Sequence, residues 1–157
     1  MKIELWLIGK TSFPYLTEGM GIYEKRLGRY LSYQTVVLAD VKNANKLPSA
    51  TLKLKEGEYV LKKLTPDDLL FLLDERGKAY TSVEFAGFME RHLSSGKKRM
   101  VFLVGGAWGF SNEIYQRANG KISLSKMTFS HQMIRLFFLE QLFRAMTILK
   151  NEPYHNE

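Results

Sequence analysis

Cysteine is absent from this sequence of 157 residues, and histidine occurs only three times. Without thiols the chain has no disulfide framework, no thiolate zinc site, no iron–sulfur cluster and no cysteine nucleophile. Long hydrophobic runs are also missing, since the most apolar stretch, around 136–139, is far shorter than the roughly 20 residues that span a bilayer. The N-terminal residues lack the apolar core of a signal peptide. We therefore expect a soluble cytoplasmic protein with no membrane partner and no metal.

Familiar nucleotide-binding and hydrolase motifs are missing as well. Gly105, Gly106 and Gly109 do not match G-x-G-x-x-G, and Gly9-Lys10-Thr11 lacks the earlier glycine of a P-loop, whose position Glu4 occupies. No G-x-S-x-G nucleophile elbow is present. A nucleotide-like ligand would have to be held mainly by backbone groups and apolar walls.

What is present is an ordinary globular composition, with 45% hydrophobic and 25% charged residues, at a length that predicts a single domain over 1–157. Apolar runs predict strands at 2–8, 33–41, 69–73, 99–104 and 122–124. Helical spacing and turn residues predict helices at 15–31, 49–64, 82–93, 111–118 and 129–150. Strands that alternate with helices predict an α/β fold, with a mostly parallel sheet and flanking helices.

Positive charge dominates the sequence, whose net charge is +7, and it is concentrated in one window. The stretch 91–135 holds eight basic side chains against the single acid Glu113: Arg91, Lys97, Lys98, Arg99, Arg117, Lys121, Lys126 and Arg135. A field of one sign attracts polyanions, so nucleic acid is the natural partner. The alternative is a solvated face that keeps the protein in solution.

Helix 129–150 is apolar around most of its circumference, and only a stripe that includes Arg135, Glu140 and Arg144 is polar. Such a helix is buried on more than one side. A domain of this size can hardly enclose it, so part of the helix is expected to meet a partner subunit. The alternative is a central core helix of a monomer.

The expected strand ends at Leu73, Val104 and Leu124 mark the edge where open α/β sheets bind ligands. Glycines after Val104 let a backbone approach a ligand closely, although they equally suit a tight strand-to-helix turn. Within this turn Trp108 either offers a stacking surface or packs locally.

Four segments together resemble the RlmH-type ribosomal RNA methyltransferases of the SPOUT superfamily. They are Gly105-Gly106-x-x-Gly109, the segment LSKMTFSH at 124–131, the segment LEQLFRA at 139–145 and the segment PYHNE at 153–157. The resemblance covers essentially the full length and is most specific in the C-terminal third. Smaller or polar residues are common in relatives where this chain has Trp108.

The resemblance implies a homodimer whose C-terminal segment threads a trefoil knot, a rare exception to un-knotted topology. It implies methyl transfer from S-adenosylmethionine to N3 of a pseudouridine in 23S ribosomal RNA, with the assembled ribosome as substrate. By motif position the cofactor-binding residues would be Leu73, Gly105, Leu124, Ser125, Lys126, Met127, Thr128 and Phe129.

Methyl transfer from a sulfonium needs alignment more than covalent catalysis, and a chain without cysteine suits a nitrogen or oxygen target better than a pyrimidine carbon. An imide nitrogen must lose its proton, which a base accepts or nearby cations favour. The catalytic candidates are His131, Arg144, Tyr154 and His155.

Each candidate also has an ordinary structural explanation. His131 could cap or pack at a helix start, and Arg144 could bind a phosphate or pair with Glu140 one turn earlier. Tyr154 and His155 lie on a polar tail, which we hypothesise completes the pocket of the other subunit.

Two other functions fit the sequence. A non-catalytic RNA- or ribosome-binding protein of the same fold would not bind S-adenosylmethionine. A flavodoxin-like small-molecule binder would be un-knotted and could be monomeric.

Overall fold

In the computed structural model, which describes residues 1–156, the strands form one parallel sheet in the order β2-β1-β4-β3-β5. They are β1 (Lys2–Ile8), β2 (Ser32–Leu38), β3 (Leu69–Ala79), β4 (Arg99–Val104) and β5 (Gly120–Ser123). The helices are α1 (Pro14–Leu27), the short 3₁₀ helix η1 (Ala44–Lys46), α2 (Ser49–Lys63), α3 (Ser82–Leu93), α4 (Asn112–Arg117) and α5 (Met133–Leu149). The predicted α/β fold with a parallel sheet and flanking helices is confirmed.

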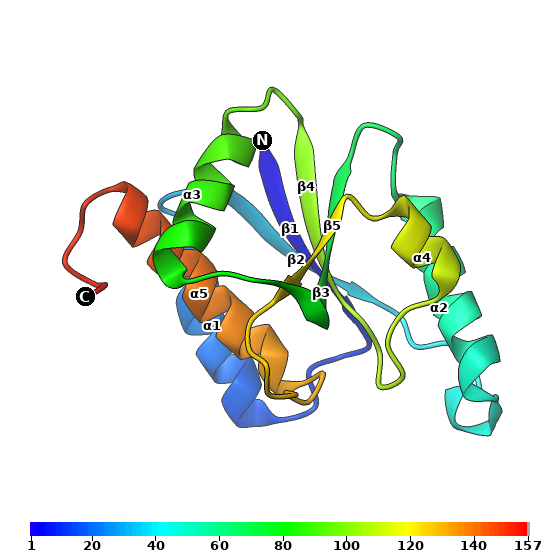
Figure 1. The fold of residues 1–157 in the computed structure, drawn as a ribbon. Coiled ribbons are helices and arrows are strands. Elements are labelled where there is room, and N and C mark those ends of the chain that lie inside the picture. The colour runs from blue at the N-terminus through cyan, green and yellow to red at the C-terminus, as the bar shows by residue number, and fades with distance from the viewer. Residues whose placement is uncertain (157) are drawn as a thin grey trace.

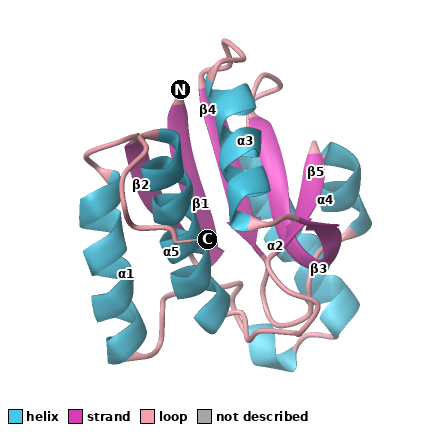
Figure 2. Cartoon of the chain, turned by 60° about the vertical axis from the view of Figure 1, so that its left-hand side comes forward, coloured by secondary structure: helices cyan, strands magenta, loops and turns pink. Residues whose placement is uncertain are grey.

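Helices cover both faces of the sheet, with α1, α3 and α5 on one face and α2 and α4 on the other (Figures 1 and 2). Successive strand side chains point to opposite faces, so Leu5 and Leu7 join one core cluster while Trp6 and Ile8 join the other. Burial on both faces explains why β1, β3 and β4 are continuous apolar runs instead of alternating ones. None of the helices in the described part of the chain is long and apolar enough to cross a membrane.

Strand β3 differs from its prediction, because it does not end at Leu73 but continues to Ala79. Its pairing with β5 shifts register, so that Leu73 and Lys78 both lie opposite Ile122. The intervening residues 74–77 therefore leave the regular ladder, as in a bulge. A Cβ on Gly77 would lie 2.6 Å from the backbone nitrogen of Ile122, so only glycine fits this close approach.

The last helix is also shorter than predicted, since α5 begins at Met133 instead of Phe129. Residues 124–132 form an irregular segment between β5 and α5. Helix α5 packs against both α1 and α3, and Phe138, Leu139 and Leu142 on it are fully buried. The expectation of burial on more than one side is confirmed for this helix.

Candidate cofactor and active site

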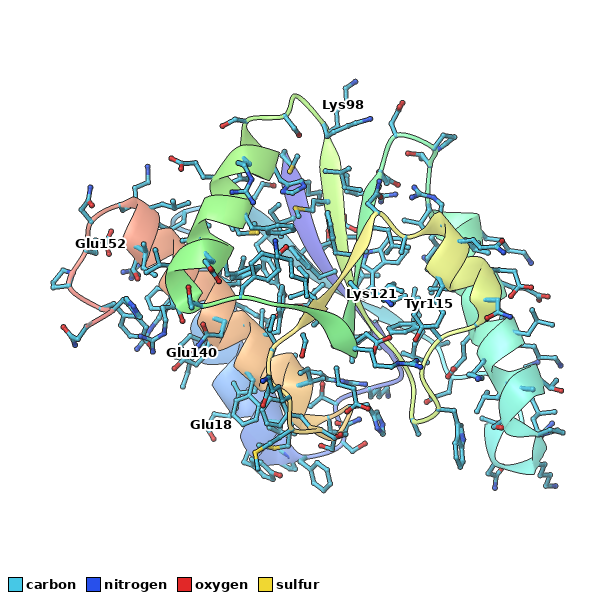
Figure 3. All side chains as sticks on the ribbon, viewed as in Figure 1. Glu18, Lys98, Tyr115, Lys121, Glu140 and Glu152 are labelled. Carbon is cyan, nitrogen blue, oxygen red and sulfur yellow. The ribbon has the colours of Figure 1, made fainter. Side chains whose placement is uncertain are left out.

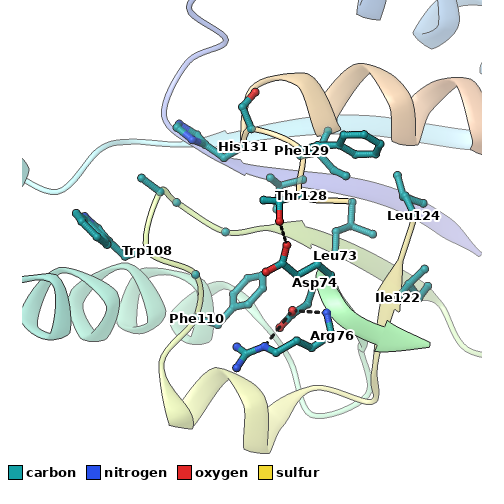
Figure 4. Close-up of a pocket in the computed structure, with 18 of the residues that line it drawn as sticks. Leu73, Asp74, Arg76, Trp108, Phe110, Ile122, Leu124, Thr128, Phe129 and His131 are labelled. Carbon is teal, nitrogen blue, oxygen red and sulfur yellow. Dashed lines mark hydrogen bonds and ion pairs between the residues drawn. The ribbon is translucent and has the colours of Figure 1, made fainter. Parts of the chain in front are cut away.

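A pocket of about 520 Å³ opens beyond the carboxyl ends of β3, β4 and β5 (Figure 4). Three segments surround it: 73–76 after the regular part of β3, 104–110 after β4, and 124–131 after β5. Its volume lies in the range typical of small-molecule sites, and the edge is the one where open α/β sheets bind ligands. Leu73, Val104, Ile122, Leu124 and Ile134 give the pocket apolar walls.

The glycine segment after β4 is a tight, closely packed turn. Gly106 and Gly109 face each other in an isolated antiparallel bridge, and the Gly109 N–H donates to the Gly106 carbonyl at 3.2 Å. Gly109 has φ of +84°, which favours glycine. A Cβ on Gly106 would lie 2.6 Å from a carboxyl oxygen of Glu56 on α2. The turn therefore brings bare backbone to the pocket wall and is supported from behind by α2.

Carboxyl groups line the opposite wall and are held in place by hydrogen bonds. The Tyr115 hydroxyl donates to Asp74 Oδ2 at 2.6 Å and accepts from Arg76 Nη2 at 2.8 Å. Burial raises the pKa of Asp74, but the hydrogen bonds from Tyr115 and from the Arg76 backbone outweigh it and hold the pKa below its usual value. Glu75 accepts a hydrogen bond from the Thr128 hydroxyl, which joins two of the three segments. The wall thus keeps negative charge close to the pocket.

His131 lines the same pocket from the segment that precedes α5. Burial lowers the pKa of its imidazole, and the nearby positive charge of Arg135 lowers it further. The imidazole is therefore neutral near pH 7 and can accept a proton.

Arg135 is fully buried and ties α5 to the end of β1. Its guanidinium donates to the carbonyls of Ile8 and Gly9 and to the Thr11 hydroxyl, each at 3.0 Å, and its Nε donates to the His131 carbonyl at 3.1 Å. Arg135 therefore does not belong to a solvent-facing basic surface, and its assignment to the RNA-attracting window was wrong in this respect. Its buried donors instead satisfy strand-end carbonyls.

The other three catalytic candidates gather at the far end of α5. Arg144 donates to Glu140 at 2.6 Å and to His155 Nδ1 at 3.2 Å, and its guanidinium lies 4.8 Å from the centre of the Tyr154 ring. The Tyr154 hydroxyl donates to the same Glu140 oxygen at 2.9 Å, and its ring packs edge-on against Phe143. Burial, with the hydrogen bonds that its hydroxyl makes to Tyr23 and Glu140, raises the pKa of Tyr154, which keeps the hydroxyl protonated.

The tail reaches this position through a turn at the end of α5. Asn151 has φ of 55°, its N–H donates to the Ile148 carbonyl, and the Glu152 N–H donates to the Thr147 carbonyl. This pattern is a Schellman motif, which reverses the chain after a helix. Residues 152–155 therefore fold back along α5.

The pocket and the tail cluster are separated within one chain. A helix advances about 1.5 Å per residue, so Arg144 lies about 17 Å along the axis from Met133, where α5 begins, and His131 precedes that residue. Figure 3 shows Glu140 and Glu152 on one side of the molecule and Tyr115 and Lys121 on the other. Seven of the eight predicted cofactor-binding residues line the pocket, whereas the exposed Lys126 does not.

Sequence reasoning missed the supporting residues of the acidic wall. Asp74 directly follows the apolar run of β3, so the rule of strand ends pointed to its position without giving it a role. Tyr115 on α4 carried no signal, because its contact with Asp74 depends on how α4 packs. Among the described residues, no group of three or more His, Asp or Glu is placed to hold a metal ion.

A parallel sheet with a pocket walled by glycine backbone at its strand ends is typical of α/β proteins that bind small ligands. Residues 1–155 match the family model described as "Predicted SPOUT methyltransferase". The chain belongs to this family of SPOUT methyltransferases.

Curated relatives match over the whole chain. The chain is 54% identical to a protein of Parabacteroides distasonis and 50% identical to one of Flavobacterium psychrophilum, each over 100% of both chains. It is 50% identical to a protein of Cytophaga hutchinsonii over 99% of this chain and 100% of the relative. Each of the three is named ribosomal RNA large subunit methyltransferase H.

Proposed function

We propose that this protein transfers a methyl group from S-adenosylmethionine to large-subunit ribosomal RNA, with N3 of a pseudouridine as the target. Membership of the SPOUT methyltransferases and the names of full-length relatives support the reaction and the RNA class. The observation that carries the proposal is the pocket at the strand ends, where glycine backbone and a histidine whose pKa is lowered by burial line the same cavity.

The residues present suit S-adenosylmethionine, which supplies an electrophilic methyl group on a cationic sulfonium when bound. Apolar walls suit its adenine ring and the methylene groups beside its sulfonium, and backbone groups of 105–109 and 124–129, which line the pocket, would bind its polar edges. Asp74 and Glu75 favour a positive ligand, and Asp74 stays ionised because its pKa is lowered. Leu73, Gly105 and the segment 124–129 are the groups that would hold the cofactor.

Within this pocket His131 is the proposed general base. An imide nitrogen becomes nucleophilic when its proton leaves, and the neutral imidazole nitrogen of His131 can take that proton. The carbonyl of His131 is held by Arg135, which fixes the backbone that carries the imidazole.

A homodimer would bring the tail to this pocket. Phe13, Tyr15 and Phe137 are exposed, and Tyr15 lies against Met133, so an apolar surface runs along α1 and the start of α5. A two-fold axis perpendicular to α5 places the two copies of this helix antiparallel. The end of one α5, with Arg144, then lies beside the start of the other. We propose that Arg144, Tyr154 and His155 of one subunit act at the pocket of its partner, where a cation stabilises the base anion.

Three further proposals rest on the family. Residues 1–157 work as one domain, the protein acts in the cytoplasm on assembled ribosomes, and the C-terminal segment is knotted. Mechanical stretching from both ends tests the knot, because a knotted chain stays shorter than its full contour length after unfolding.

The test of the function is tritiated methyl transfer from S-adenosylmethionine to ribosomes that lack the modification, followed by mapping of the labelled base. We expect label on N3 of one pseudouridine in the large subunit. Calorimetry in low and high salt distinguishes the enzyme from a non-catalytic RNA-binding protein. The non-catalytic protein would bind RNA in a salt-dependent way and would show no heat on titration with S-adenosylmethionine.

A further inference from the structure

Two exposed apolar side chains border the pocket. Met127 is 76% exposed and Trp108 is 63% exposed, the two highest values among the described large hydrophobic residues. Both residues line the pocket. A tryptophan this exposed is unusual, since the residue is highly buried on average. Large apolar groups left in water beside a pocket mark a surface that a ligand covers.

Trp108 is presented by a turn whose backbone is fixed. The bridge between Gly106 and Gly109 closes the turn, and Glu56 packs directly behind Gly106. No aromatic ring or cation of the described chain packs on the Trp108 indole. In the view of Figure 4, Trp108 and His131 lie toward the left of the pocket, whereas Ile122 and Leu124 close its right side. The indole is therefore held beside the mouth of the pocket and is mostly open to solvent.

The chain's other tryptophan serves the fold. Trp6 is 1% exposed, its Nε1 donates to Glu4 at 2.6 Å, and the Arg99 guanidinium lies 5.4 Å from the centre of its ring. Trp6 is thus buried, hydrogen-bonded and covered by a cation, as a tryptophan of the core is expected to be. Trp108 has no such contact with the described residues.

We propose that Trp108 is a stacking platform for a nucleobase of the RNA substrate, namely a base next to the one that is methylated. This inference rests on the proposed function. A uridine-type N3 lies on the Watson–Crick edge, so the target must leave its stack to reach the pocket. Its departure uncovers the face of a neighbouring base, which an aromatic ring at the pocket mouth can cover.

Charge favours RNA over a protein as the occupant. The chain has a net charge of +7, which attracts the phosphate backbone. In the proposed function the two carboxylates on the pocket wall, Asp74 and Glu75, face the cationic cofactor and not the RNA. Every base has a π-face, so Trp108 contributes affinity and positioning without reading sequence.

The kinetic test compares Trp108→Ala and Trp108→Phe with the unchanged protein on ribosomes that lack the modification. Loss of one base stack predicts a KM for ribosomes raised about 10- to 100-fold in Trp108→Ala, with kcat within about two-fold. Trp108→Phe keeps a ring and should restore most of the loss. Tyr59→Ala, which removes an exposed aromatic from α2 outside the pocket, is the matched control and should leave both constants unchanged.

A fluorescence titration tests the stacking itself, with single-stranded oligoadenylate as the probe. Because Trp6 is buried, quenching by the probe reports Trp108, and we expect it to disappear in Trp108→Phe. An unchanged KM in Trp108→Ala, while the unchanged protein methylates ribosomes, overturns the inference and leaves the function standing. A loss of cofactor affinity by calorimetry, or a change of oligomeric state by light scattering, also overturns it by assigning the ring to the cofactor or to a subunit contact.

Discussion

At the scale of single residues, His131 and Arg135 form a coupled pair one helical turn apart. Arg135 is fully buried, its donors are satisfied by oxygens of Ile8, Gly9, Thr11 and His131, and its charge lowers the pKa of the imidazole. Arg135 thus fixes the start of α5, and its charge adds to burial in lowering the pKa of the neighbouring imidazole.

The first prediction concerns His131. His131→Ala and His131→Gln should lower methyl transfer about 10²- to 10⁴-fold, the usual contribution of a general base, with cofactor affinity retained. Because the pKa of His131 is below its usual value of 6.5, the activity of the unchanged protein should persist to acid pH and fall only below that value. Measuring the rate of methyl transfer across pH checks this. If the rate of His131→Gln still falls at acid pH, a group other than His131 causes the fall.

A second prediction tests how much Arg135 contributes to the stability of the fold. Arg135→Met removes the donors of two buried carbonyls and should lower the free energy of unfolding by about 3 kcal/mol, since each unsatisfied buried group costs about 1–3 kcal/mol. Urea denaturation measures it. Arg91→Met on the exposed face of α3 is the control, expected within about 0.5 kcal/mol of the unchanged protein. Equal stability of both variants would contradict the anchoring role of Arg135.

Part of the site could be predicted at this scale. Leu73, Gly105 and Leu124 follow from the rule that ligands bind at the ends of parallel strands, since each ends an apolar run or follows one. Arg135 could not be placed, because a basic residue in a basic stretch predicts exposure and only the packing of α5 against the end of β1 buries it. Tyr115 was missed for the same reason, since its role arises from a contact between distant elements.

At the scale of elements, the glycine turn after β4 depends on α2. Gly57 of α2 leaves no space for a side chain, since a Cβ would lie 2.7 Å from Ser111 Oγ, and Glu56 beside it abuts Gly106. Burial, followed by the negative charge of Asp40, raises the pKa of Glu56 to about 7. The support of the turn therefore contains a titratable group.

The third prediction uses this group. The folded carboxyl holds its proton up to about pH 7, whereas an ordinary glutamate loses it near 4.5, so Glu56 costs stability as pH rises through that window. Glu56→Gln should therefore match the unchanged protein in Tm at pH 4 and exceed it at pH 8. The exposed Glu58→Gln on the same helix is the control. A Tm difference between Glu56→Gln and the unchanged protein that does not grow with pH would show that ionisation of Glu56 does not destabilise the fold.

The elements themselves were largely predictable. Continuous apolar runs predicted β1, β3 and β4 because these strands are covered on both faces. The extension of β3 to Ala79 could not be predicted from the sequence. Residues 74–77 are polar, and the strand continues beyond them only because Lys78 and Ala79 pair with β5. Helix α1 forms although it contains glycines at 19 and 21, and at Gly19 the close approach of Leu136 on α5 accounts for the small residue.

At the scale of the whole molecule, α5 connects the two functional clusters. The segment just before α5 carries the pocket histidine, whereas the end of α5 carries Arg144 with the folded-back tail, and most of the length of the helix lies between them. A single chain therefore cannot unite the four catalytic candidates, whereas an antiparallel pair of α5 helices can.

The fourth prediction is that removal of residues 153–157 severely lowers methyl transfer and leaves cofactor binding nearly intact, because the proposed cofactor-binding segments lie in the other cluster. Calorimetry and methyl transfer measure the two effects, and thermal unfolding confirms that the shortened chain folds. Normal methylation by the shortened protein would show that the tail has no part in the reaction.

Complementation tests the composite site most directly. His131→Ala dimers and shortened dimers, each inactive alone, are mixed in equal amounts and allowed to exchange subunits. In a mixed dimer one pocket has both its own His131 and an intact partner tail, so the mixture should regain about a quarter of the original methyl transfer to ribosomes. A mixture that exchanges subunits, as shown by mass spectrometry, and stays inactive would contradict a pocket completed by the partner's tail.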